Sequence, residues 1–256
     1  AHSGTVALAG ENILQKEAED LRQTRQKVQF IFQDPYSSLN PRKRAEAIVR
    51  EPLDSLSQKT EVEKAKIVDE LFEAVGLRPE QQRLFPHQFS GGQRQRIGIA
   101  RALATQPELI ICDEPVSALD VAVQAQILNL LRKLQKDFGL TYLFISHDLG
   151  VVQHMSDSIA VMYMGRVVEH ADRLSLFQTP RHPYTQALLS AVPTVDRAKR
   201  AQQKRILIPG DPPDPVNLPL GCRFANRCPV AEAICQTVEP ELKSDANGHR
   251  TACHLV

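Results

Sequence analysis

The sequence predicts an α/β fold built on a parallel sheet, followed by a small appendix with little regular structure. Short apolar runs alternate along the chain with longer stretches of helical period, which is the order of elements in such folds. The apolar runs are nearly continuous, as is typical of strands that are buried on both faces. After about residue 179 prolines become frequent, and regular structure should give way to loops.

In the first part of the chain the apolar pattern changes repeatedly between a strand period and a helix period. Gly10, the pair Asn40-Pro41 and Gly76 should end elements, because Gly and Pro favour turns and helix ends. The elements expected here are a strand over 6–9, a polar helix around 14–21, a strand over 28–32, a helix over 62–75 and a helix over 90–104.

The second part continues the same alternation. The elements expected here are a strand over 109–112, a helix over 121–138 that ends before Gly139, a strand over 141–145 and a strand over 159–164. Gly165-Arg166 should turn this last strand into Val167-Val168. The prolines that mark the appendix are Pro209, Pro212, Pro213, Pro215 and Pro219. We expect the appendix to need a stabiliser of its own.

Bulk composition narrows the possible functions. The 256 residues suffice for one large domain or two small ones with a substantial core. A formal net charge of +1 gives no electrostatic sign of a nucleic-acid partner. No apolar run approaches the roughly 18 residues that a membrane-spanning helix needs, so a membrane role would require a partner subunit. Five cysteines are few for a disulfide scaffold.

Two short motifs indicate phosphate chemistry. Ser90–Gln93 is a Ser-Gly-Gly turn that opens a helix, where free backbone N–H groups and the helix dipole favour an anion. About twenty residues later an apolar strand ends in Asp113-Glu114, a position suited to Mg²⁺ and an attacking water. Each motif alone is weak, because such turns are mostly plain loops and such carboxylates are mostly solvated strand ends. Together, in this order, they favour a nucleotide-hydrolysing enzyme.

The pair resembles the signature and Walker B motifs of ATP-binding cassette (ABC) ATPases. Three flanking segments are similar to further motifs of that family: Phe32–Pro35 to the Q-loop, Ser117–Asp120 to the D-loop and Ser146–Asp148 to the loop of the switch histidine. Arg181–Thr185 and the cysteine-bearing tail resemble the dipeptide, oligopeptide and nickel importer subfamily. The resemblance covers essentially the whole chain and implies a P-loop NTPase-type ABC cassette.

The resemblance also implies three parts. These are an incomplete α/β ATPase core over 1–33 and 101–178, a helical subdomain over 34–100 with the Q-loop and signature motif, and an oligopeptide-importer-type appendix over 179–256 with the cysteines. No Gly-x-x-x-x-Gly-Lys-Ser/Thr occurs in the sequence. The family has this P-loop just upstream of a segment like Ser3–Gly10, so we expect a piece that begins after the first strand and the P-loop. Such a piece alone should be inactive.

Residue roles follow from the matched motifs. Glu114 would polarise the water that attacks the γ-phosphate, and His147 would reach the same phosphate, so these two are the expected catalytic residues. Outside this series a lone histidine is usually structural. Asp113 and Gln33 would hold Mg²⁺. The signature loop would close on ATP held by the opposing subunit. The full set expected to bind nucleotide and its metal is Gln33, Ser90, Gly91, Gly92, Gln93, Asp113 and Asp120.

The resemblance implies an ATPase subunit that energises import of peptides or related small solutes, nickel among them, by ATP-driven dimer closure. The implied partners are a second ABC ATPase subunit, identical or different, two transmembrane permease subunits and an extracytoplasmic solute-binding protein, with no nucleic acid. The chain would be peripheral, at the cytoplasmic face of a bacterial or archaeal plasma membrane. Tyr36–Pro41 would contact the permease, unless it is a plain surface loop.

Two other functions were weighed. The missing P-loop supports a non-catalytic fragment or a metal-binding regulatory module. A DNA-repair ABC ATPase is disfavoured, because the insertion between Gln33 and Ser90 is too short for a long coiled coil.

The cysteines fall into two groups. Cys112 lies in an apolar strand and is expected to be a small core residue. Cys222, Cys228, Cys235 and Cys253 are separated by five, six and seventeen residues, wider gaps than zinc pairs usually have. Four thiolates also suit a [4Fe–4S] cluster, which the subfamily resemblance implies; zinc, free thiols or a disulfide remain alternatives. Because the tail has few large apolar residues, we expect this metal to order it.

Overall fold

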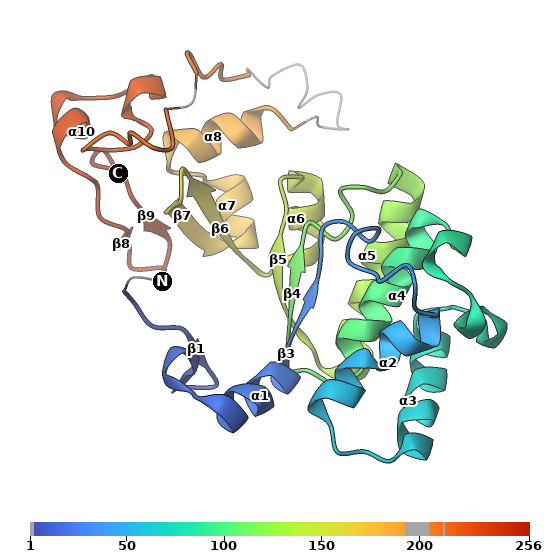
Figure 1. Ribbon diagram of the computed structural model, residues 1–256. Coiled ribbons are helices and arrows are strands. Elements are labelled where there is room, and N and C mark those ends of the chain that lie inside the picture. The colour runs from blue at the N-terminus through green and yellow to red at the C-terminus, as the bar shows by residue number, and fades with distance from the viewer. Residues whose placement is uncertain (1–2, 193–204, 212) are drawn as a thin grey trace. The chain divides into compact units, whose positions relative to one another are not determined.

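The computed structural model describes residues 3–192, 205–211 and 213–256, and its chain divides into two units, Ala1–His147 and Asp148–Val256 (Figure 1). The first unit contains β1 (Ala7–Leu8), β2 (Glu11–Asn12), η1 (Ile13–Gln15), α1 (Ala18–Lys27), β3 (Val28–Ile31), α2 (Ala45–Leu56), α3 (Glu61–Ala74), η2 (Pro79–Arg83), η3 (Pro86–Gln88), α4 (Gly91–Leu103), β4 (Leu109–Asp113), α5 (Val121–Phe138) and β5 (Thr141–Ile145).

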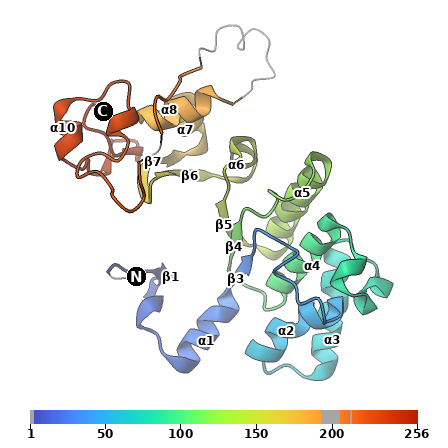
Figure 2. The same ribbon diagram turned by 45° about the horizontal axis from the view of Figure 1, so that its top comes forward.

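The predicted parallel sheet is present in the first unit. Its strand order is β3-β4-β5, and both pairings are parallel. The three strands lie side by side in both views (Figures 1 and 2). The register places Cys112 of β4 opposite Ile31 of β3 and Phe144 of β5. All three carboxyl ends therefore meet at one edge of the sheet.

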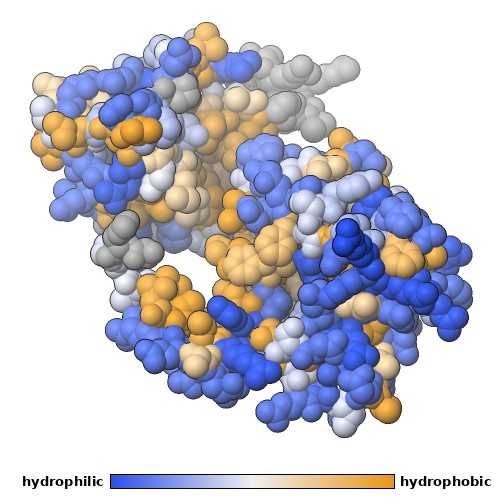
Figure 3. Space-filling model, viewed as in Figure 1, coloured by the Kyte–Doolittle hydropathy of each residue, from blue (hydrophilic) through white to orange (hydrophobic). Residues whose placement is uncertain are grey.

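The two faces of this sheet differ. Ile31, Ile110 and Cys112 share one face and are at most 1% exposed. On the opposite face Phe30 and Leu143 are 45% and 52% exposed. Apolar residues, in orange, accordingly reach the otherwise hydrophilic surface of this unit (Figure 3). The strands were predicted to be buried on both faces; in this unit one face is buried and the other is partly exposed.

Helix ends follow local sequence chemistry. Thr60 caps α3 in a capping box with Glu63, and Gly139 ends α5 with a left-handed φ of 65°. The prediction missed α2 as a separate helix because Pro52 lies inside it, and proline normally interrupts a helix. Burial of the face that carries Ile48 and Leu53, both 0% exposed, outweighs that local preference.

The second unit contains α6 (Leu149–Met155), β6 (Ser158–Tyr163), β7 (Arg166–Asp172), α7 (Arg173–Gln178), α8 (Pro183–Ser190), η4 (Ala225–Arg227), α10 (Ala233–Thr237), β8 (Lys243–Ser244) and β9 (Arg250–Thr251). The strand predicted over 159–164 is β6. It belongs to a separate antiparallel sheet of order β6-β7-β9-β8 and does not extend the parallel sheet. The hairpin turn lies one residue earlier than predicted, at Met164-Gly165, both with positive φ.

The tail contributes to the core of the second unit. Phe224, 1% exposed, packs edge-on against Tyr163, with ring centroids 5.3 Å apart, and lies 5.5 Å from Tyr184. Strand β9 adds main-chain bonding to β7. The expectation that the tail lacks the apolar contacts to order itself was therefore wrong: one well-buried aromatic ring and a strand pairing tie it to the hairpin.

Candidate functional site

Three polar side chains meet at the carboxyl edge of the parallel sheet. Gln33 follows β3, Glu114 follows β4 and His147 follows β5, so the strand order sets Glu114 between the other two. Nε2 of Gln33 donates to Oε2 of Glu114 at 2.8 Å. Nδ1 of His147 donates to Oε1 at 2.8 Å. Both carboxylate oxygens are thus fixed by neighbours from adjacent strands.

These contacts hold the carboxylate in its ionised form. The hydrogen bond from His147 is the largest of the influences that lower the pKa of Glu114, followed by the charge of that ring and by smaller bonds from Ser117 and Gln33. The Glu114 side chain is 21% exposed and that of His147 is 74% exposed. A water molecule could therefore reach an anionic oxygen here.

The backbone at Glu114 is unusual. Its φ of 44° lies in the left-handed region, which a residue with a β-carbon seldom adopts. The conformation is held on both sides: the Glu114 N–H donates to the carbonyl of Ile145 at 3.0 Å, and its carbonyl accepts from the N–H of Ser117 at 3.2 Å. Such a conformation persists only where surrounding structure enforces it, and here two backbone hydrogen bonds do so.

The predicted signature loop opens α4. Ser90 caps the helix, accepting from the N–H of Gln93 at 3.3 Å, while the Gln93 amide oxygen accepts from the N–H of Ser90 at 3.0 Å. A β-carbon on Gly92 would stand 2.5 Å from Cγ1 of Val123 in α5, whereas one on Gly91 would stand 3.5 Å from Leu119. The glycines therefore let the helix start approach the D-loop segment closely.

Asp120 has a local task in this structure. Its Oδ1 accepts from the N–H of Val123 at 3.0 Å and caps α5. The structure thus joins Gln33, Glu114 and His147 by direct bonds, while Ser90 and Asp120 bond within the caps of their own helices.

The residues at the sheet edge fit Mg²⁺ with a nucleotide phosphate. Asp113 is the exposed last residue of β4 and directly precedes Glu114, so a second carboxylate lies at the same edge of the sheet. Mg²⁺ is usually held by one or two carboxylates plus substrate phosphates and waters. Within the described ranges no group of three or more His, Cys, Asp or Glu side chains is placed to hold a metal ion.

The two groups of cysteines differ in how well the structure matches the expectation for them. Cys112 is fully buried, and burial raises the pKa of its thiol to about 12, as suits a core residue. The four tail cysteines are free thiols, and the Cys222 N–H donates to the carbonyl of Cys235 at 2.8 Å. Burial raises the pKa of Cys222, and the other three thiols add to it. The absence of a metal-binding group noted above includes the described tail, so the iron–sulfur cluster stays a prediction.

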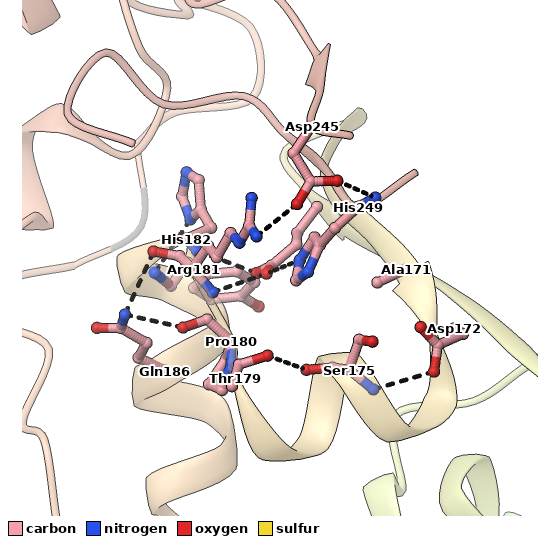
Figure 4. A network of polar contacts seen from close by, with 12 residues as sticks. Ala171, Asp172, Ser175, Thr179, Pro180, Arg181, His182, Gln186, Asp245 and His249 are labelled. Atoms are coloured by element: carbon pink, nitrogen blue, oxygen red, sulfur yellow. Dashed lines mark hydrogen bonds and ion pairs between the residues drawn. The ribbon is translucent and has the colours of Figure 1, made fainter. Parts of the chain in front are cut away.

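A buried polar network was missed by the sequence analysis (Figure 4). Glu169 of β7 is 0% exposed and accepts from the N–H groups of Arg181 at 2.7 Å and His182 at 3.1 Å, and from Nε2 of His249 at 2.7 Å. Arg181 also pairs with Asp245 at 2.6 Å. Arg181 and His182 lie in a recognisable motif, whereas Glu169 and His249 carry no local sequence signal.

Histidine 182 is part of the same junction. Its Nδ1 accepts from the N–H of Tyr184 at 3.1 Å and so caps α8, and burial lowers the pKa of His182 to about 4. A neutral ring is what an accepting nitrogen requires. The segment that resembled the importer subfamily is therefore, in this structure, a junction that ties α8 and the tail to β7.

Comparison with known proteins agrees with this geometry. The ABC transporter family matches residues 1–117, and the C-terminal region of oligopeptide/dipeptide transporters matches residues 168–235. The ATP-binding cassette MJ0796, solved as a post-hydrolysis dimer bound to ADP and Pi, is 30% identical, with a TM-score of 0.59 over 67% of this chain and 74% of that chain. CbiO1 of Clostridium perfringens, part of an ABC transporter complex, is 27% identical, with a TM-score of 0.62 over 69% of each chain. The fold is that of an ABC ATPase cassette.

Relatives among curated proteins narrow the family. The oligopeptide transport ATP-binding protein AppF of Bacillus subtilis is 51% identical over 98% of this chain and 77% of its own length. A probable peptide ABC transporter ATP-binding protein of Sinorhizobium fredii is 47% identical over 99% of this chain and 71% of its own. The chain belongs to the ATP-binding proteins of the oligopeptide and dipeptide ABC transporters, which confirms the resemblance seen in the sequence. In the described part of the chain, no helix has the length and apolar character needed to span a membrane.

Proposed function

We propose that this chain is an ATPase subunit that energises the import of peptides, or of related small solutes such as nickel, through a membrane permease. The observation that carries the proposal is the carboxylate of Glu114, held ionised between Gln33 and His147 at the carboxyl edge of a parallel sheet. The names of the relatives supply the transported class.

In this proposal Glu114 orients and activates the attacking water. Its carboxylate is ionised, and both of its oxygens are held in place by hydrogen bonds from Gln33 and His147. His147 and Gln33 position that carboxylate, and each would offer a polar group to the reacting phosphate. Asp113 takes part in holding Mg²⁺, with Gln33. When bound, Mg–ATP supplies the phosphoryl group that is transferred to water.

The signature residues Ser90–Gln93 act on nucleotide held by a second subunit, and Asp120 lies across the same interface. Two ATPase subunits would work beneath two permease subunits fed by a solute-binding protein, at the cytoplasmic face of the membrane. Residues 36–41 would contact the permease. The proposed functional parts are a core over 1–33 and 101–178, a helical part over 34–100 and an appendix over 179–256.

The test is peptide-driven turnover in the full-length protein, reconstituted with its permease and binding protein in vesicles. Wild type should hydrolyse ATP faster when the binding protein carries peptide, and labelled peptide should accumulate inside the vesicles. Nickel in place of peptide provides the competing substrate class. If neither peptide nor nickel changes the rate of ATP hydrolysis and neither accumulates inside the vesicles, the proposed function is refuted.

We also propose that Cys222, Cys228, Cys235 and Cys253 bind a [4Fe–4S] cluster. Support comes from four unpaired thiols, one pair of which is drawn together by the backbone bond between Cys222 and Cys235. Protein purified without oxygen should be brown and hold about four Fe and four sulfide per chain. Cys228→Ser should bleach it, whereas the core variant Cys112→Ala should not. A colourless protein with one equivalent of zinc would reverse the assignment.

A further inference from the structure

Two arginines of α4 reach back to the loop that carries Gln33. Arg94 and Arg101 lie about two turns apart and so project from one face of the helix. The Arg94 side chain is buried, and its Nε donates to the carbonyl of Pro86 at 2.7 Å. Its guanidinium carbon lies 3.7 Å from the centroid of the Tyr36 ring. This is close contact for a cation over an aromatic face.

Arg101 makes the second connection. Its Nη1 donates to the carbonyl of Ser38 at 2.6 Å, and its guanidinium lies 5.7 Å from the centroid of the Phe32 ring. Burial lowers the pKa of Arg101, which means that the charge is partly removed from water. A desolvated guanidinium needs such partners, so both contacts resist separation of the loop from α4.

The loop itself is a tight turn. Oδ1 of Asp34 accepts from the N–H of Tyr36 at 2.7 Å, and the Asp34 carbonyl accepts from the N–H of Ser38 at 3.2 Å. Leu39 anchors its end at 2% exposure. Because the turn is internally bonded, a displacement of Tyr36 or Ser38 should carry Gln33 with it.

We propose that Arg94 and Arg101 form an arginine brace: positioning residues that make the loop over 32–39 move together with α4. One end of this body is Gln33, bonded to Glu114, and the other is Ser90 at the start of α4. A shift of the signature loop therefore changes the support of the activating carboxylate in the same subunit. As a role in catalysis, the brace rests on the proposed ATPase function.

The first test is hydrogen exchange in the full-length protein. Tyr36→Leu should speed exchange of the 32–39 amides about fivefold to thirtyfold, the range of a partly desolvated cation–π contact. Tyr36 is 67% exposed, so this variant should fold. Tyr36→Phe keeps the ring and should restore most of the protection.

A matched control lies on the same helix. Nη1 of Arg96 donates to the carbonyl of Val75 at 2.5 Å, so Arg96→Met also removes an arginine bond to a backbone oxygen, in this case a partly buried one at the end of α3. It should speed exchange near 75–76 and leave the amides over 32–39 unchanged. Arg94→Met should speed exchange of the 32–39 amides and leave exchange near 75–76 unchanged.

The second test is steady-state turnover. Tyr36→Leu should lower kcat about fivefold to tenfold and change KM for ATP less than about twofold, because the brace acts on the carboxylate rather than on nucleotide affinity. Arg94→Met and Tyr36→Leu combined should be no slower than the slower single variant. Exchange and kcat that stay at wild-type values in Tyr36→Leu overturn the brace. An inactive wild type refutes the proposed function, while the exchange comparison still tests the mechanical link.

Discussion

Gly92 of α4 and Val123 of α5 stand so close that a β-carbon added to the glycine would lie 2.5 Å from Cγ1 of the valine. Val123 also donates its N–H to Asp120. The signature loop is thereby packed directly on the helix that the D-loop aspartate caps. The two motifs that would face an opposing subunit are therefore in direct contact within this chain and should move together.

Gly92→Ala should disturb this contact. Overpacking of this kind typically costs about 1–3 kcal/mol, and urea unfolding of the full-length protein should register it. Val123→Ala in the same chain should recover much of the loss, because it removes the clashing methyl groups. Gly91→Ala is the matched control: the new methyl group would meet Leu119 at the ordinary contact distance of 3.5 Å. If Gly91→Ala destabilises as much as Gly92→Ala, the explanation by Val123 fails.

Glu114→Gln should abolish most turnover and leave nucleotide binding intact. The amide keeps the size of the side chain but cannot take the proton of a water molecule. ATP-dependent dimers should therefore accumulate, which light scattering after gel filtration would detect. Glu108 provides the control, since its exposed carboxylate pairs with Lys27 at 3.0 Å, away from the catalytic site, and Glu108→Gln should turn over like wild type. Wild-type turnover in Glu114→Gln would remove the residue from the mechanism.

The titration of Glu114 should depend on His147. Carbon NMR of labelled glutamate should find the pKa of Glu114 below its ordinary value of 4.5, with the hydrogen bond from His147 as the main cause. His147→Ala should move that pKa upward, and Gln33→Leu should move it less. Because the folded-state pKa is the lower one, the stabilisation is complete above the unfolded value and is lost as pH falls through the folded value. An unchanged titration in His147→Ala would mean that the bond does not form in solution.

Local sequence patterns could locate Gln33, Glu114 and His147, because each follows directly on an apolar strand and parallel strands gather such positions at one edge. They could not locate contacts that depend on packing between distant segments. Arg94 and Tyr36 lie on separate elements, and a polar arginine in a helix predicts an exposed side chain.

Contacts between distant segments also explain why the structure of the second unit could not be predicted from local sequence patterns. Glu169 and His249 are eighty positions apart, and a charged residue in a strand normally indicates a solvated face. The pairing of β9 with β7 likewise leaves no sequence signal, because β9 has two residues, too few to show an alternating pattern. Composition therefore suggested a tail without a core. It counts large apolar residues, but it does not show that Phe224 fills a site between two tyrosines or that Ile208, Cys222 and Cys228 pack against the same core.

Phe224→Ala tests that explanation of the tail. The ring is 1% exposed among Tyr163 and Tyr184, so its removal leaves a cavity and should cost about 3–5 kcal/mol. Limited proteolysis should then cleave the tail, and near-ultraviolet circular dichroism should lose tyrosine signal. Leu220→Ala lies four positions away in the same tail, with 90% of the side chain exposed, and should change neither. Metal content measured in both variants separates the two possible stabilisers: if the tail of Phe224→Ala stays protected until the metal is removed, the metal and not the aromatic core orders it.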